Sequence, residues 1–118
     1  VNMKIVIGGQ LGKHEIEKCL RDMKVPGLEV EVKDDMSASM DIKSGRADYY
    51  LGACLTGGGG ALAMAIAMLG YGSCKALASS DAEAISNALD AGIRAFGFTP
   101  QLTNQVVPVI VREIMKRS

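Results

Sequence analysis

The sequence predicts an α/β fold of three layers (αβα), in which helices cover both faces of a five-stranded parallel sheet. Two observations lead to this prediction. Short apolar, β-branched runs alternate five times with segments whose apolar residues recur at helical spacing. No long linker, internal repeat or low-complexity stretch interrupts that alternation. Strict alternation of strands and helices is typical of a parallel sheet with helices on both sides.

The expected elements follow the chain in order. Strands are predicted at residues 3–8, 28–33, 48–54, 75–78 and 93–98. Helices are predicted at residues 14–24, 38–44, 59–69, 80–91 and from 99 to the end of the chain. The expected boundary signals are Pro26-Gly27, a Ser37 N-cap, a Ser80–Glu83 capping box, Gly92 as a C′ residue, Thr99-Pro100, and a break in the last helix at Pro108.

Composition limits the classes of function. The 118 residues fit one domain, residues 1–118, and 48% of them are hydrophobic, which is enough for a buried core. The 13 Lys and Arg residues balance the 13 Asp and Glu residues, so neither nucleic acid nor an anionic membrane is favoured as a partner. No apolar run predicts membrane insertion, and no secretory signal is recognisable.

The cysteine and histidine content argues against a metal site. The chain has three Cys without CxxC spacing and a single His, His14. This pattern indicates reduced thiols in a cytoplasmic protein, without a metal or other cofactor. Cys19 is expected in the core because of its helical spacing, and Cys74 is interpreted as structural. His14 is interpreted as a solvated residue at a helix start.

The strand patterns suggest an order for the sheet. Residues 28–33 alternate apolar and charged side chains, as an edge strand does, whereas residues 3–8 and 48–54 are apolar enough for interior positions. With right-handed crossovers, this predicts the flavodoxin-like, Rossmann-like order 2-1-3-4-5. In such sheets ligands bind beyond the carboxyl ends of the strands, where the order reverses between the first and third strands.

Two glycine-rich loops fall at that predicted position. Glycines at a helix N-terminus leave N–H groups available and admit a ligand close to the backbone, which predicts binding of a small anionic, phosphorylated metabolite. Alternatively, the glycines let a helix pack closely on the sheet or on a second subunit. The candidate anion-binding residues are Gly8, Gly9, Gln10, Gly12 and Lys13 after the first strand, and Thr56, Gly57, Gly58, Gly59 and Gly60 after the third.

Cys54 is the candidate catalytic residue. It follows the third predicted strand and precedes a helix N-terminus, a position that favours the thiolate, which could act as a base or a nucleophile. The alternative is a small buried apolar residue. Asp34 and Asp35 are interpreted as solvated helix-cap residues. Tyr49 and Tyr50 are expected at the opposite edge of the sheet, away from the site.

The predicted helix from Ala61 to Leu69 carries no charge and is apolar all round. Such a helix must be buried on every side, and a small sheet covers only one of them. We therefore expect this helix to form the interface of a homo-oligomer, most simply a homodimer. Burial between neighbouring helices of one subunit is the alternative.

Over nearly its whole length the sequence resembles a small bacterial glycine-rich family, the domain of unknown function 2620. The resemblance rests on MKIVIGG, on the block DDMSASMDIKSGRADYYLGACLTGGGGALAMAIAMLGYG and on AFGFT. It implies a cytoplasmic bacterial protein without an established activity.

DYYLGACLTGGGGALAMAIA is also similar, more distantly, to type-B ribose-5-phosphate and galactose-6-phosphate isomerases. There the Cys of a Cys-Gly-Thr-Gly-x-Gly loop is the base that moves a proton between C1 and C2 of an open sugar, and the loop holds the enediolate oxygen. Cys54, Thr56, Gly57 and Gly59 match that loop. Other functional positions of the family correspond here to Gln10 and Leu11, and to Ala61, Ala65 and Ile66, so its substrate contacts are not kept.

Three functional hypotheses follow. The first is a metabolite-binding protein, with isomerase-like chemistry if Cys54 is a base. The second is a non-catalytic oligomeric subunit or regulator whose glycine loop serves packing. The third rests on a likeness of Cys-x-Thr-Gly to the phosphocysteine loop of phosphotransferase IIB proteins, although there the Cys follows the first strand.

Overall fold

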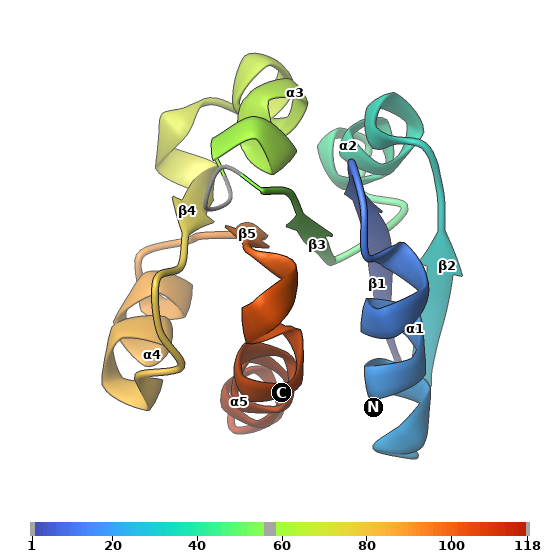
Figure 1. Cartoon of the computed structure of the whole chain (residues 1–118), viewed down its shortest axis with the longest axis vertical. Helices are drawn as coiled ribbons and strands as arrows, with labels where there is room; N and C mark the ends of the chain where they lie inside the picture. Colours follow the sequence, from blue (N-terminus) through green and yellow to red (C-terminus); the bar gives the residue numbers. More distant parts are fainter. Residues whose placement is uncertain (1, 56–58, 118) are drawn as a thin grey trace.

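Five parallel strands form one sheet in the computed structural model, which describes residues 2–55 and 59–117. The order across the sheet is β2-β1-β3-β5-β4 (Figure 1). The strands are β1 (Met3–Gly9), β2 (Leu28–Val32), β3 (Tyr49–Ala53), β4 (Cys74–Ala76) and β5 (Ala95–Phe98). Every neighbouring pair is parallel, so the predicted parallel α/β sheet is confirmed.

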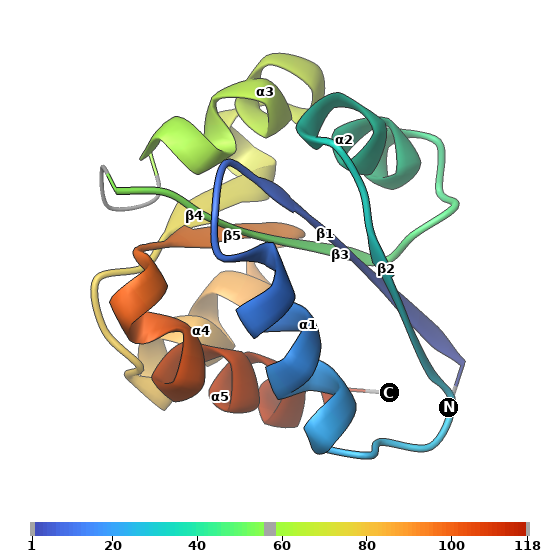
Figure 2. The ribbon, with the colours of Figure 1, turned by 45° about the vertical axis from the view of Figure 1, so that its right-hand side comes forward.

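Helices cover both faces of the sheet, as the three-layer prediction requires. Figure 2 shows α2 and α3 on one face and α1, α4 and α5 on the other. The helices are α1 (Lys13–Asp22), α2 (Asp35–Lys43), α3 (Gly59–Leu69), α4 (Ala82–Asp90) and α5 (Thr103–Met115), with short 3₁₀ turns η1 (Tyr71–Ser73) and η2 (Pro100–Leu102). The buried apolar residues accordingly form two clusters, one on each face.

The predicted order of the last two strands is wrong. β5 lies between β3 and β4, and β4 is the edge strand. The side chains explain the exchange. All four residues of β5 are buried, whereas Lys75 and Ala76 of the three-residue β4 are exposed. The more apolar strand therefore takes the interior position, and the chain skips one place on leaving β3.

Several helix boundaries and signals also differ from the prediction, and Thr99 caps the 3₁₀ turn η2 while α5 begins at Thr103. α2 begins before Ser37, because the Asp34 carboxylate is the N-cap and accepts a hydrogen bond from the Ser37 N–H at 2.9 Å. Asp81, not Ser80, caps α4. α5 runs through Pro108 without a break. Its buried face, which includes Val107 and Val111, holds the helix together although Pro108 donates no backbone hydrogen bond.

Candidate functional site

The carboxyl ends of β1 and β3 lie side by side at the centre of the sheet. Gly8 pairs with Gly52, and Gly9 pairs with Ala53. The chain then turns from β1 into α1 on one face and from β3 into α3 on the other (Figure 2). The reversal of strand order expected between the first and third strands is therefore present, and the two glycine-containing loops begin there.

Cys54 follows β3 directly and is buried, with 1% of its surface exposed. Its backbone N–H donates to the carbonyl of Phe98 at 3.1 Å, which ties it to the end of β5. Its Sγ accepts a hydrogen bond from the N–H of Ala61 at 3.1 Å. Ala61 lies in the first turn of α3, so the sulfur faces the N-terminus of that helix as the sequence predicted.

The loop after β3 is only partly described. Thr56, Gly57 and Gly58 lie outside the described residues, and α3 begins at Gly59 and Gly60. Leu55, which precedes the undescribed segment, is 74% exposed.

The loop after β1 has internal partners for its first backbone N–H groups. The Gly9 N–H donates to Asp35 at 3.3 Å. The N–H groups of Gln10 and Leu11 both donate to the carbonyl of Ala53, at 3.1 and 3.3 Å. These bonds join the loop to β3 and α2, so its backbone contributes to the connection between elements.

Gly12 and Lys13 have local structural roles as well. Gly12 is the N-cap of α1 with a φ of 71°, a left-handed conformation that suits glycine. The Lys13 ammonium donates to the carbonyl of Lys33 at 2.8 Å and so joins the start of α1 to the segment after β2. His14, the next residue, has a side chain that is 94% exposed, which confirms its interpretation as a solvated residue.

Tyr50 explains why Gly8 and Gly52 are glycines. Its ring is fully buried, and a Cβ atom at Gly8 would lie 2.5 Å from the ring carbon Cε2. A Cβ atom at Gly52 would lie 2.9 Å from the Tyr50 hydroxyl. Neither contact is possible between non-bonded atoms, so both positions must lack a side chain for the ring to occupy this place.

The expectation that Tyr50 lies away from the site is wrong. Its hydroxyl lies 2.5 Å from Oδ1 of Asp35 and 2.7 Å from the carbonyl oxygen of Ala61, the residue whose N–H reaches Cys54. The ring lies over Gly8 and Gly52, so the hydroxyl reaches toward the carboxyl end of β3 although Tyr50 is the second residue of that strand. The Tyr-x-Gly spacing of Tyr50 and Gly52 was the available signal, because residues i and i+2 share a face.

Asp35 also differs from its interpretation as a solvated cap residue. Asp34 does cap α2, but Asp35 is partly buried and accepts from both Gly9 and Tyr50. Burial, reinforced by the Asp35 carboxylate, raises the pKa of the Tyr50 hydroxyl far above its usual value. Tyr50 is therefore neutral and acts as a hydrogen-bond donor.

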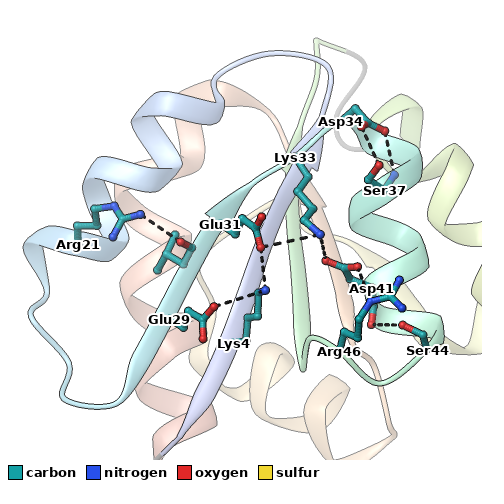
Figure 3. Close-up of polar contacts among 11 residues, drawn as sticks. Lys4, Arg21, Glu29, Glu31, Lys33, Asp34, Ser37, Asp41, Ser44 and Arg46 are labelled. Carbon is teal, nitrogen blue, oxygen red and sulfur yellow. Dashed lines mark hydrogen bonds and ion pairs between the residues drawn. The ribbon is translucent and has the colours of Figure 1, made fainter.

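A charged cluster on the same face pairs its charges internally (Figure 3). Lys33 and Arg46 flank the buried carboxylate of Asp41, and Lys4 lies 2.7 Å from Glu31. The bonds from Lys33 and then Arg46 lower the pKa of Asp41. These ion pairs connect β1, β2 and α2.

Among residues 2–55 and 59–117, no group of three or more His, Cys, Asp or Glu is placed to hold a metal ion. Within the same part of the chain, no helix is both long and apolar enough to cross a membrane.

A family model described as "Protein of unknown function DUF2620" matches residues 3–114. The chain belongs to the DUF2620 family. Among its relatives is the "Uncharacterized protein YhfU" of Escherichia coli K12, which is 35% identical over 116 residues, covering 94% of this chain and 97% of the relative. The protein of that name from Shigella flexneri has the same identity and coverage. No solved structure matches the chain.

The family match covers β1 through most of α5, so it includes every candidate residue. Of these, the structure brings Cys54, Gly8 and Gly9 to one end of the sheet, and it places Gly59 and Gly60 at the start of α3. Tyr50 and Asp35 join them in this DUF2620 protein, although the sequence interpretation left both out.

Proposed function

We propose that this member of the DUF2620 family binds a small anionic metabolite, most simply a phosphorylated one, at the junction of β3 and α3. One observation carries the proposal. The first turn of α3 directs the Ala61 N–H at the buried Sγ of Cys54, at the point where the strand order reverses. A helix N-terminus attracts negative charge, and an N–H donor stabilises a thiolate more than a thiol.

The same arrangement supports a chemical role for the sulfur. A thiolate at the end of β3 could accept a proton from a carbon next to a carbonyl group, and N–H groups of the loop could stabilise the enediolate oxygen. This is the proton transfer of an aldose–ketose isomerase. It would need Cys54 as the base, with the loop that follows it as the oxyanion site.

An NMR titration with inorganic phosphate tests the binding. Chloride at equal ionic strength is the control. We expect phosphate to shift the amide signals of Gly60 and Ala61 in a saturable way, while signals from α4 stay in place. Shifts that chloride reproduces, or that spread evenly over the surface, would overturn the proposal.

Deuterium exchange tests the chemistry separately. The protein is incubated with aldose phosphates in D₂O, and deuterium at C2 is followed by NMR or mass spectrometry. An isomerase-like protein should incorporate one deuterium, and the Cys54→Ser variant should not. If phosphate binds but no deuterium is incorporated, the protein is a binding protein, and isomerase activity toward the sugars used is excluded.

A second candidate function, an oligomeric subunit, is favoured by the outer surface of α2 and α3. These helices pack side by side, and their outer face exposes Met36, Met40, Ala63, Ala67 and, just after α3, Tyr71. α3 itself has no charged residue. We propose that this face forms a homodimer through the helix from Ala61 to Leu69, because apolar area of this kind is stabilised by a partner.

Light scattering tests the dimer. We expect a mass of twice the 12.4 kDa of one chain. Ala63→Glu, which places a charge on the exposed face of α3, should return the protein to a monomer. Ala82→Glu, an equal change at an exposed position of α4, is the matched control and should leave the dimer intact. A wild-type mass of one chain would exclude the interface.

A further inference from the structure

Tyr50 connects its own strand β3 to three other elements, β1, α2 and α3. Its ring fills the space above Gly8 of β1 and Gly52 of β3. Its hydroxyl reaches Asp35 at the start of α2 and the Ala61 carbonyl at the start of α3. The two glycines make room for the ring, and the hydroxyl at its end meets polar groups at the starts of two helices, which is more than core packing requires.

The hydroxyl acts on the residue that contacts Cys54. Ala61 is held from two sides, since its carbonyl faces Tyr50 at 2.7 Å and its N–H donates to the Cys54 sulfur at 3.1 Å. Asp35 Oδ1 and the Ala61 carbonyl oxygen are both acceptors that share the one proton of the hydroxyl, and Asp35 is itself held by the Gly9 N–H. The contacts form a continuous path from Asp35 through Tyr50 and Ala61 to Cys54.

We propose that Tyr50 and Asp35 are positioning residues that set the orientation of the first turn of α3 toward Cys54 and the bound anion. The inference rests on the proposed function, because the anion site is the one proposed there. Neither residue needs to touch the ligand. Their effect passes through Ala61, whose N–H direction decides how strongly the helix start stabilises negative charge at the sulfur and beside it.

Polar and titratable groups of the neighbouring elements surround Tyr50, and they decide which control variants are needed. Tyr50 is faced by Asp35 from α2, by the Gly9 N–H from β1 and by the Cys74 thiol from β4. Burial raises the pKa of Cys74, so that thiol is neutral near pH 7. Replacing Cys74 and Cys19 by Ala leaves Cys54 as the single thiol and removes any contribution of Cys74 to the titration.

The first measurement is phosphate affinity by NMR in Tyr50→Phe and Asp35→Asn. Tyr50→Phe keeps the buried ring and removes only the hydroxyl. We expect each variant to lose about tenfold in affinity, the size of effect that one hydrogen bond gives. Tyr49→Phe and Asp34→Asn are the matched controls, since Asn caps a helix as well as Asp does, and both should bind phosphate as the wild type does.

The second measurement is the pH titration of Cys54 by the ¹³Cβ signal of labelled cysteine, which needs no access to the buried sulfur. We expect the midpoint to rise by about one pH unit in Tyr50→Phe and in Asp35→Asn, because the thiolate loses part of its hydrogen bond. It should not move in Tyr49→Phe or Asp34→Asn. A purely structural role would not give this selective shift.

The outcomes separate the two proposals. If the wild type binds no phosphate, the proposed function fails, and the Cys54 titration still decides whether Tyr50 and Asp35 position α3. If phosphate binds but Tyr50→Phe and Tyr49→Phe agree in both affinity and titration midpoint, the positioning role is excluded while the binding function stands. Weaker phosphate binding and a raised Cys54 midpoint in Tyr50→Phe and Asp35→Asn, but not in Tyr49→Phe or Asp34→Asn, would support both the binding function and the positioning role.

Discussion

The ring of Tyr50 occupies the space that a side chain at Gly8 would need, with Cε2 2.5 Å from the position of a Cβ atom. Gly8→Ala should therefore destabilise the protein by about 1–3 kcal/mol, the usual cost of overpacking a core. Urea unfolding measures the change. Gly72→Ala, at a glycine with nothing within 4 Å of a Cβ atom, is the control and should stay within about 0.5 kcal/mol of the wild type. Equal stabilities for the two variants would contradict the packing argument.

Asp41 predicts an acid-sensitive contribution to stability. Lys33 first, and then Arg46, lower its pKa in the folded protein. The unfolded state therefore binds a proton at higher pH than the folded state does. The stabilisation is fully present above the ordinary carboxyl pKa of about 3.9 and is lost as the pH falls through the lower folded value.

In Asp41→Asn the free energy of unfolding should fall less than in the wild type as the pH is lowered from neutral to strongly acidic; this falling part of the curve is its acid limb. The measurement is urea unfolding at a series of pH values from neutral to strongly acidic. Asp22→Asn, which changes an exposed carboxylate on α1, is the matched control and should keep the wild-type limb. An unchanged acid limb in Asp41→Asn would show that the pair with Lys33 and Arg46 does not contribute.

Pro108 predicts a stabilising substitution. It lies inside α5, where it donates no backbone hydrogen bond. Pro108→Ala restores that donor in a helix that is already continuous, so thermal or urea unfolding should show a gain of about 1–2 kcal/mol, part of the cost of proline in a helix interior. Gln105→Ala, at an exposed position of α5, gives the effect of alanine alone. A loss of stability in Pro108→Ala would mean that packing of the proline ring outweighs the missing bond.

The three cysteines should differ in the pH at which they are alkylated. Burial raises the pKa of Cys19 and of Cys74, so their rates should reach half-maximum above the ordinary thiol range. If Cys54 is held as the proposed function requires, its midpoint lies lower. Iodoacetamide labelling with mass spectrometry of each peptide gives the three midpoints, and midpoints are compared because the absolute rate at buried Cys54 also depends on access. A Cys54 midpoint at or above that of Cys19 would remove it as a base.

Local patterns predicted most of the fold. Apolar runs located all five strands, and helical spacing located all five helices, because each element must bury an apolar face. The exchange of β4 and β5 was missed because the sequence order of strands does not determine their order in space. It was indicated only by the contrast between the all-apolar β5 and the shorter β4 that contains Lys75.

The candidate site was predicted in part. The position of Cys54 at a strand end before a helix follows from the order of elements, which the sequence shows. The contact of Tyr50 with Asp35 and Ala61 depends on the reach of a ring over two glycines and on the placement of α2 beside α3. Such contacts are set by tertiary packing, and single-sequence periodicity does not contain them.

The position of β4 has a consequence for the order of events during synthesis. Within residues 2–55 and 59–117, β4 pairs with no strand but β5, and the ribosome adds the roughly 20 residues between these strands in about 1–4 s. During that interval β4 has been made without the strand that joins it to β3. The first three strands can associate early, and α3 can pack against α2 and β1, but β4 must wait for β5, so the sheet is completed only after β5 has been synthesised.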